Sequence, residues 1–238
     1  VLIEKPMAIK SEEVRILIEE AKKNNVEIME GFMYAFHPQF DRIMNTIKSN
    51  ILGDISYAHS MFSFPIQPAR FYRIDRSMEN GGGALWDIGP YAIHTLRQCF
   101  KENPKRVKAI AKLNEHGADI STSGLIDFGN SKRATFDISF ECTRRSEFEV
   151  FGPLGRVKCP TVWQPEDKQA KIIINTESSG LTEEVVPAAN HFILEVNHFN
   201  KIISSDISPK LSKDDALWNA RTLESIQESV QKDSWVTL

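Results

Sequence analysis

The 238-residue chain has few cysteines, no long apolar run and no excess of basic residues. Its three cysteines, Cys99, Cys142 and Cys159, are an odd number at wide spacing, which argues against a disulfide framework or a paired-cysteine metal site and fits a reducing cytoplasm. No apolar run approaches the ~18 to 20 residues of a membrane-spanning helix. The N-terminal residues also lack the pattern of a secretion signal. These absences predict a cytoplasmic protein with neither a membrane partner nor a bound metal.

Positive charge is not in excess either. The formal net charge is -3 and the isoelectric point is near 6.1, so no basic field favours nucleic acid as a partner. With 41% hydrophobic residues, the chain can bury a sizeable core. The composition is that of an ordinary globular protein.

Glycine is missing from the start of the chain, where none precedes Gly31. The phosphate-binding turn of the G-x-G-x-x-G kind is therefore absent before that residue. Yet the beginning has the pattern of a parallel sheet, because residues 1–4 read as the end of a strand. A helix with Ser11 as its N-cap follows, and then a short strand from Val26 to Met29. We expect the chain to begin within a doubly wound domain.

The middle of the chain alternates apolar and polar residues, which is typical of strands with one covered face. From Asp54, the larger side chains of Tyr57, His59 and Met61 have this period, and Ala134 to Phe140 repeat it. Gly129–Ser131 and Gly152–Gly155 are predicted as turns between strands. The alternating positions are Ile55, Tyr57, His59, Met61, Ala134, Phe136, Ile138, Phe140, Phe148 and Val150. The pattern predicts an open, mainly antiparallel sheet.

Helices flank this sheet in sequence. Phe192, Val196, Phe199 and Ile203 form one apolar stripe at helical spacing, and Ser212 to Asp215 resembles a capping box before a second helix. The fold class is therefore α/β, with an α+β C-terminal part. We predict a remnant of a dinucleotide-binding domain at residues 1–35 and a substrate-binding and oligomerisation domain at residues 36–238.

Lys5, in Glu4-Lys5-Pro6, is the first candidate for chemistry. A lysine at the carboxyl end of a parallel strand points to the side where α/β sheets bind ligands. Beside a nicotinamide cofactor, its ammonium would stabilise negative charge on a substrate oxygen and depress the pKa of a nearby phenol. A surface lysine before a turn proline is the alternative.

The second candidate is the block Gly81 to His94, in which three glycines allow close approach and three polar side chains follow. On a helix that begins near Trp86, Asp87, Tyr91 and His94 stand at positions i, i+4 and i+7 and share one face. A carboxylate, a phenol and an imidazole together can bind a polyol and exchange a proton with it. The alternative is an N-cap, a packing tyrosine and a core histidine.

Other residues are weaker candidates. Tyr34 and His37 could border the ligand site, but His37-Pro38 is better explained as a helix start. Arg73 could contact a phosphate or a substrate, but a surface arginine is the better explanation. The remaining histidines lack metal-ligand spacing.

Five segments together resemble the glucose-fructose oxidoreductase, inositol dehydrogenase and rhizopine catabolism (Gfo/Idh/MocA) family. They occur in the family's order over nearly the whole chain: Val1–Pro6, Glu30–Gln39, Gly81–Tyr91, Phe151–Gly155 and Ser208–Leu217. The resemblance implies an N-terminal Rossmann domain that binds NADP or NAD, most of which this chain lacks, and a C-terminal domain with an open sheet.

The resemblance also implies roles for individual residues. Lys5 matches the family's catalytic lysine, with Glu4 and Pro6 beside it at the cofactor. Tyr91 stands where inositol dehydrogenase-like members have a histidine, as in the branch of dihydrodiol and xylose dehydrogenases, and would be the general acid/base. Asp87 and His94 occupy positions of substrate contact or orientation. Relatives commonly pair through the open face of the sheet, so a homodimer is expected.

Two functions from different classes remain open. The first is an enzyme that transfers a hydride between NAD(P) and a hydroxyl-bearing carbon of a sugar, polyol or related diol. The second is a noncatalytic substrate-binding or oligomerisation module, because a chain without the glycine turn cannot hold the pyrophosphate.

Overall fold

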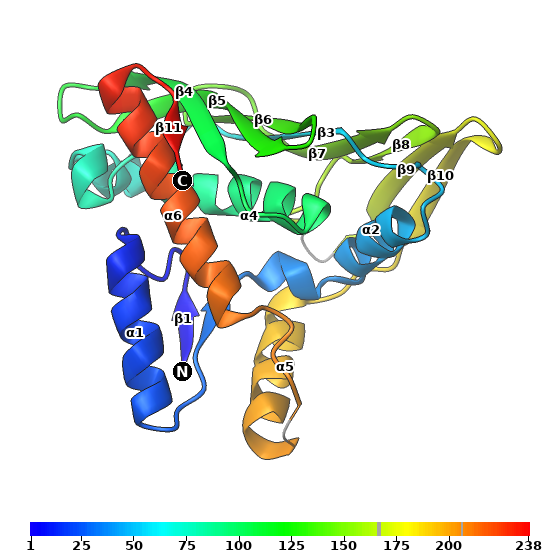
Figure 1. Ribbon diagram of the computed structural model, residues 1–238, viewed down its shortest axis with the longest axis horizontal. Coiled ribbons are helices and arrows are strands. Elements are labelled where there is room, and N and C mark those ends of the chain that lie inside the picture. Colours follow the sequence, from blue (N-terminus) through cyan, green and yellow to red (C-terminus); the bar gives the residue numbers. More distant parts are fainter. Residues whose placement is uncertain (166–167, 206) are drawn as a thin grey trace.

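The structure is a computed structural model that describes residues 1–165, 168–205 and 207–238 (Figure 1). Two sheets organise it: a parallel pair of strands and a nine-stranded mixed sheet. The first unit comprises β1 (Leu2–Glu4), α1 (Ser11–Lys23) and β2 (Met29–Gly31). The helices that follow are η1 (Met33–Phe36), α2 (Pro38–Lys48), η2 (Pro68–Arg73), η3 (Met78–Asn80), α3 (Ala84–Asp87), α4 (Gly89–Phe100), α5 (His191–Ser205) and α6 (Lys213–Lys232).

The large sheet has the order β10-β9-β8-β7-β3-β6-β5-β4-β11, and among its described strand pairs β3–β6 alone is parallel. The prediction of a mainly antiparallel sheet is therefore confirmed, as are both predicted turns. Its strands are β3 (Tyr57–Ser63), β4 (Arg106–Leu113), β5 (Asp119–Gly129), β6 (Lys132–Ser139), β7 (Arg145–Gly152), β8 (Gly155–Cys159), β9 (Ala170–Thr176), β10 (Gly180–Val186) and β11 (Val236–Thr237).

The parallel unit at the start of the chain is present, with corrected boundaries. β1 pairs with β2 in parallel, Leu2 opposite Met29, so the second strand begins at Met29 and not at Val26. α1 has Lys10 as its N-cap and not Ser11, because Glu13 accepts a hydrogen bond from the Lys10 amide. The Ser11 hydroxyl instead donates to Glu224 of α6 at 2.7 Å, which joins α1 to the C-terminal helix.

Helices cover one face of the large sheet: α4 packs against β3 and α6 against β4, as Figure 1 shows beneath the sheet. The core between these layers is rich in aromatic rings. Phe62 of β3 stacks on Trp163 with ring centroids 4.8 Å apart, and both side chains are buried. Burial of this apolar surface supplies most of the driving force for the fold.

The alternation in β3 left open which of its two faces is covered. Ala58, Ser60 and Phe62 are buried, whereas Tyr57, His59 and Met61 lie on the face without helices. The buried side accepts a serine because Ser60 donates to the Ala92 carbonyl of α4 at 3.3 Å. The larger side chains therefore belong to the open face.

The predicted stripe on α5 is also corrected. Phe192, Val196 and Ile203 are exposed, and of that stripe only Phe199 is buried. The buried side of this helix is formed by His191, Glu195, Phe199 and Ile202. In contrast, Ser212 caps α6 as predicted and accepts a hydrogen bond from the Asp215 amide at 3.0 Å.

A break separates Asp87 from Tyr91, which were expected on one continuous helix. α3 ends at Asp87, Ile88 caps it, and α4 begins at Gly89. Pro90 has no backbone N–H, so the hydrogen-bond ladder of α3 cannot continue through it. The two side chains therefore leave from different helices.

Candidate functional site

Lys5 and Asp87 lie in direct contact, although 82 residues separate them. The Lys5 ammonium donates to the Asp87 backbone carbonyl and lies 3.5 Å from Oδ1 of its carboxylate. Only 9% of the lysine side chain and 5% of the aspartate side chain are exposed. Burial lowers the pKa of Lys5, and the negative charge of Asp87 opposes that shift.

Tyr91 completes this group. The Lys5 ammonium lies over its ring, 4.7 Å from the centroid. The tyrosine side chain is buried, and its hydroxyl lies 3.7 Å from the sulfur of Met33, a weak acceptor. Among the described residues the phenol thus donates to a weak acceptor, which leaves it able to form a stronger hydrogen bond with a ligand.

The electrostatics of Tyr91 differ from the expectation that Lys5 depresses the pKa of the phenol. Burial raises the pKa of Tyr91 well above its usual value, and the carboxylates of Glu4 and Asp87 raise it further. Arg70 acts in the opposite direction. In this chain Tyr91 is thus held as the neutral phenol, the form that donates a proton.

Two arginines also contact the Asp87 carboxylate. Arg73 Nη1 lies 3.0 Å from Asp87 Oδ1, and Arg70 Nη2 lies 3.2 Å from Asp87 Oδ2. Both come from η2, the 3-10 helix after β3. The sequence singled out Arg73; it missed Arg70, three residues earlier, because charge alone did not separate that residue from other surface arginines.

The glycine run positions α3 by close approach to a buried carboxylate. Gly83 has φ +96°, and a Cβ on it would lie 1.9 Å from Asp119 Oδ1. Asp119 Oδ2 accepts the Leu85 amide at 2.9 Å, at the start of α3. Burial raises the pKa of Asp119 to about 7, against the hydrogen bonds from Thr122 and from the helix amides.

His94 belongs to a neighbouring buried network. Its Nδ1 is bonded to the Tyr34 hydroxyl, and its Nε2 lies 2.7 Å from Asp215 Oδ2. Arg97 donates to the other oxygen of that carboxylate at 2.8 Å. Burial raises the pKa of Asp215, but His94 and Arg97 outweigh it and hold the pKa well below its usual range.

This network lies directly behind Tyr91. The rings of Tyr34 and Tyr91 are 6.1 Å apart, and Thr95 donates to the Tyr91 carbonyl at 2.8 Å. Neither His94 nor Tyr34 has any exposed surface, so substrate contact by these two residues stays a prediction. Sequence reasoning missed Asp215 as a partner of His94, since it read that residue only as part of a helix cap.

The remaining candidates surround these groups. Glu4 is exposed at the end of β1, and Pro6 is half-buried; the Lys5–Pro6 peptide bond is cis. His37 caps α2, where its Nδ1 accepts the Gln39 amide at 3.1 Å. That contact favours the structural interpretation of His37 as a helix start.

Two buried carboxyl groups near the site were not predicted. Glu30 accepts the Met7 amide at 2.8 Å, and burial raises its pKa to about 7. Glu195 of α5 has an oxygen 3.7 Å from the Cβ position of Gly31, and burial, followed by the charge of Glu4, raises its pKa to about 7. Each has a buried oxygen without a hydrogen-bond partner in the described structure.

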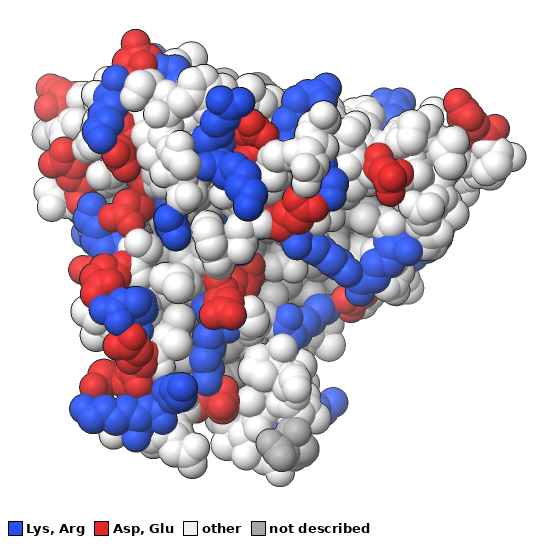
Figure 2. Space-filling view, in the orientation of Figure 1, with Lys and Arg blue, Asp and Glu red and all other residues white. Residues whose placement is uncertain are grey.

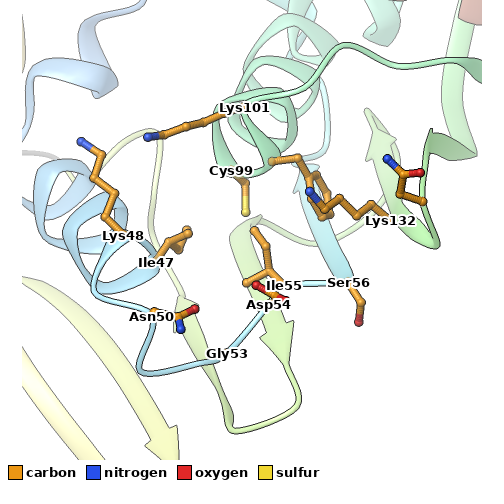
Figure 3. Close-up of a pocket in the computed structure, with 12 residues that line it drawn as sticks. Ile47, Lys48, Asn50, Gly53, Asp54, Ile55, Ser56, Cys99, Lys101 and Lys132 are labelled. Carbon is orange, nitrogen blue, oxygen red and sulfur yellow. The ribbon is translucent and has the colours of Figure 1, made fainter.

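A cavity of about 490 Å³ lies elsewhere, where α2 and α4 end near the β5–β6 turn (Figure 3). Lys48, Lys101 and Lys132 line it, together with Asp54, and none of the predicted site residues does. Cys99 also lines it, and burial raises the pKa of that thiol well above its usual value. The cavity is therefore not the candidate site.

Among residues 1–165, 168–205 and 207–238, no cluster of three histidine, cysteine or acidic side chains could hold a metal ion. Within the same ranges, no helix has the length and apolar character needed to cross a bilayer. All three cysteines are free thiols. Figure 2 shows acidic and basic side chains intermingled on the visible face, without a broad basic patch.

Comparison with known sequences gives a consistent set of relatives. The family model of the GFO/IDH/MocA C-terminal domain matches residues 40–158. Trans-1,2-dihydrobenzene-1,2-diol dehydrogenase of Xenopus laevis is 31% identical over 179 residues, 74% of this chain and 52% of that enzyme. D-xylose 1-dehydrogenase (NADP(+)) 2 of Haloferax volcanii is 26% identical over 240 residues, the whole of this chain and 73% of that enzyme.

Solved structures show the same architecture. The aldose-aldose oxidoreductase from Caulobacter crescentus, crystallised with glycerol, superposes with a TM-score of 0.88 at 21% identity. It covers all of this chain, which in turn spans 72% of that protein. At this identity the likeness concerns the fold alone.

Proposed function

The chain belongs to the Gfo/Idh/MocA family of oxidoreductases, and from this premise we propose that it takes part in hydride transfer between NADP or NAD and a hydroxyl-bearing carbon of a sugar, polyol or related diol. The observation that carries the proposal is the contact of the buried Lys5 ammonium with both the Asp87 carboxylate and the Tyr91 ring.

The residues present fit the nicotinamide end of such a cofactor. Lys5 follows a parallel strand on the side where α/β sheets bind nucleotides, and Glu195 has a buried oxygen that lacks a partner in the described structure. When bound, the nicotinamide accepts or gives up the hydride. Lys5, with Glu4 and Pro6 beside it, would face that ring.

In the reduction direction the substrate carbonyl oxygen must gain a proton as the hydride arrives on its carbon, and oxidation is the reverse of this step. Lys5 would stabilise the negative charge on that oxygen, and burial increases the strength of this interaction. Tyr91, held as the neutral phenol, would donate its proton to the same oxygen, and the phenolate left behind would lie beside the Lys5 ammonium. Asp87 would orient Lys5. His94, which is bonded to Tyr34, would fix the position of α4, the helix that carries Tyr91.

A noncatalytic role of these 238 residues on their own is the second candidate. It is favoured by one observation: no glycine precedes Gly31, so the turn that would bind the pyrophosphate is not among these residues. Under this alternative the chain binds substrate or a second copy without turnover. The open face of the large sheet, with Tyr57, His59 and Met61, would be the surface of self-association.

Substitution Tyr91→Phe tests the catalytic proposal. In the enzyme that contains this chain, we expect kcat to fall by ~10² or more while cofactor affinity stays within about twofold, because a general acid/base is lost and packing is kept. Steady-state kinetics and cofactor titration measure the two effects. Tyr57→Phe is the matched control, since it removes one hydroxyl from the open face and should leave kcat unchanged.

Equal losses of binding and turnover in Tyr91→Phe would assign a packing role to this tyrosine. Absence of turnover by the unchanged protein, with substrate still bound, would favour the noncatalytic module.

A further inference from the structure

Three cations surround the single buried carboxylate of Asp87. Lys5, Arg70 and Arg73 all lie within 3.5 Å of its oxygens. One carboxylate can neutralise one of them, so the group carries surplus positive charge. Glu4 and Glu195 are other acidic groups whose negative charge raises the pKa of Tyr91. Glu4 lies in β1 and Glu195 in α5, whereas both arginines lie in η2.

The two arginines are partly open to solvent, which the lysine is not. The side chains of Arg70 and Arg73 are 42% and 35% exposed, against 9% for Lys5. Each uses one guanidinium nitrogen on Asp87, so donors remain on both. Arg73 Nε is moreover buried without a partner in the described structure.

Both guanidinium groups are held in place before any ligand arrives. Arg70 lies 5.4 Å from the centre of the Phe64 ring, and Arg73 lies 5.1 Å from that of Tyr72. The Arg73 carbonyl also accepts the Gly83 amide at 2.7 Å, which ties η2 to the glycine run. Side chains fixed in this way lose little entropy when they bind a ligand.

We propose that Arg70 and Arg73 form an anion subsite next to the Lys5–Tyr91 pair, so that the preferred substrate is a polyol or sugar that carries a carboxylate or phosphate group. The inference rests on the proposed hydride transfer for the position of the reacting hydroxyl. A guanidinium fork matches the planar carboxylate and the phosphate oxygens, which a neutral sugar cannot exploit.

Kinetics with matched substrates test the subsite in the enzyme that contains this chain. D-glucose is the neutral substrate, D-glucuronate supplies a carboxylate and D-glucose 6-phosphate supplies a phosphate. We expect kcat/KM to be higher for one of the two anionic sugars, and the better of them identifies the group. Arg70→Gln should lower that value about tenfold to a hundredfold, the range for losing a charged hydrogen bond.

Any loss that the same variant causes through Asp87 and Tyr91 is common to D-glucose and the anionic sugar, so the ratio of their kcat/KM values should fall about tenfold or more. Arg70→Lys retains the charge without the fork and should recover part of the loss. Arg76→Gln, an equal charge change at an exposed position of the same segment, is the control and should leave all values unchanged. Equal losses for neutral and anionic sugars, or a preference for D-glucose, would overturn the subsite.

Binding separates this inference from the proposed function. Isothermal titration with D-gluconate needs no turnover, and Arg70→Gln should weaken it by the same factor. If no sugar is oxidised and gluconate binding still depends on Arg70, hydride transfer fails and the anion subsite stands. If sugars are oxidised and gluconate binds both proteins alike or neither, the subsite fails and the oxidoreductase stands.

Discussion

Buried acidic groups are the feature that dominates the chain at the scale of single residues. Glu30, Asp119 and Glu195 each have a pKa raised to about 7 by burial, whereas Asp215 has one held low by His94 and Arg97. The difference follows from the hydrogen-bond partners, because of these four groups Asp215 is the one that contacts His94 and the Arg97 guanidinium. The raised groups bind protons more tightly in the folded than in the unfolded chain.

This difference predicts how stability depends on pH. For a carboxyl with a raised pKa the folded state binds more protons, so the free energy of unfolding falls as pH rises from the unfolded pKa through about 7. Glu30→Gln removes one such group and keeps an acceptor for the Met7 amide. Between about pH 5 and about pH 8, we expect the variant to lose less stability than the unchanged protein, by on the order of 1 to 3 kcal/mol.

Urea unfolding across this pH range measures the slope. Glu19→Gln, on the exposed side of α1, is the control and should leave the slope unchanged. Parallel curves for Glu30→Gln and the unchanged protein would contradict the assignment of a raised pKa to Glu30.

At the scale of elements, the corner between η3 and α3 decides where Asp87 stands. Gly83 combines a left-handed φ with a position against Asp119, so it tolerates no side chain. The helix break at Ile88 then separates Asp87 from Tyr91 and lets Lys5 contact both.

Gly83→Ala should therefore be severely destabilising, by about 3 kcal/mol or more, since backbone strain and a clash with a buried carboxyl act together. Gly180→Ala is the matched control: Gly180 also has a left-handed φ, +66°, but no atom lies within 4 Å of the added Cβ. Gly180→Ala should lower the free energy of unfolding by about 1 kcal/mol. Thermal unfolding of the two variants compares them, and similar losses would mean that the contact with Asp119 relaxes at little cost.

Periodicity in the sequence identified the type of most elements but not which face is covered. In β3 both alternating sets are compatible with burial, and only the packing of α4 against Ala58 and Ser60 decides between them. Likewise, the exposed Phe192 and Val196 of α5 have helical spacing without a covering layer. Propensity is local, whereas the covering layer comes from residues far along the chain.

The candidate site could likewise be predicted only in part. The sequence identified Lys5, Asp87 and Tyr91 as candidates because each stands in a short motif whose residues suggest a chemistry. The sequence did not identify Asp215 as the partner of His94, since 121 residues separate them and no local pattern links them. Arg70 was missed for the same reason: its role follows from the path of η2.

At the scale of the whole molecule, helices cover one face of a nine-stranded sheet and the other face is open. The open face is a mixture of rings and ion pairs. Tyr57 stacks on Phe151, while Arg156 pairs with Glu149 at 2.9 Å. A depression of about 400 Å³ lies between Met61 and the strands beside it. Such a surface suits a symmetric contact between two copies.

We expect Met61→Glu to abolish this association, because a charge would be buried in the centre of the interface. Sedimentation velocity at tens of micromolar should give a dimer or higher species for the unchanged protein and a monomer for the variant. Lys171→Glu, a charge change on the peripheral strand β9, should leave the assembly intact. A strictly monomeric unchanged protein would rule out self-association through this face.

Asp215 lies far beyond α4 in the sequence, so α4 is synthesised well before the carboxylate that packs against it. Asp215 is 118 residues beyond Arg97, so the ribosome completes α4 long before it delivers the carboxylate that pairs with the buried Arg97 guanidinium and contacts His94. A buried cation without its partner is strongly destabilising. The helix that carries Tyr91 can therefore reach its final packing only after α6 has emerged, and a nascent or clipped chain that ends before Ser212 should expose this helix to chaperones and proteases.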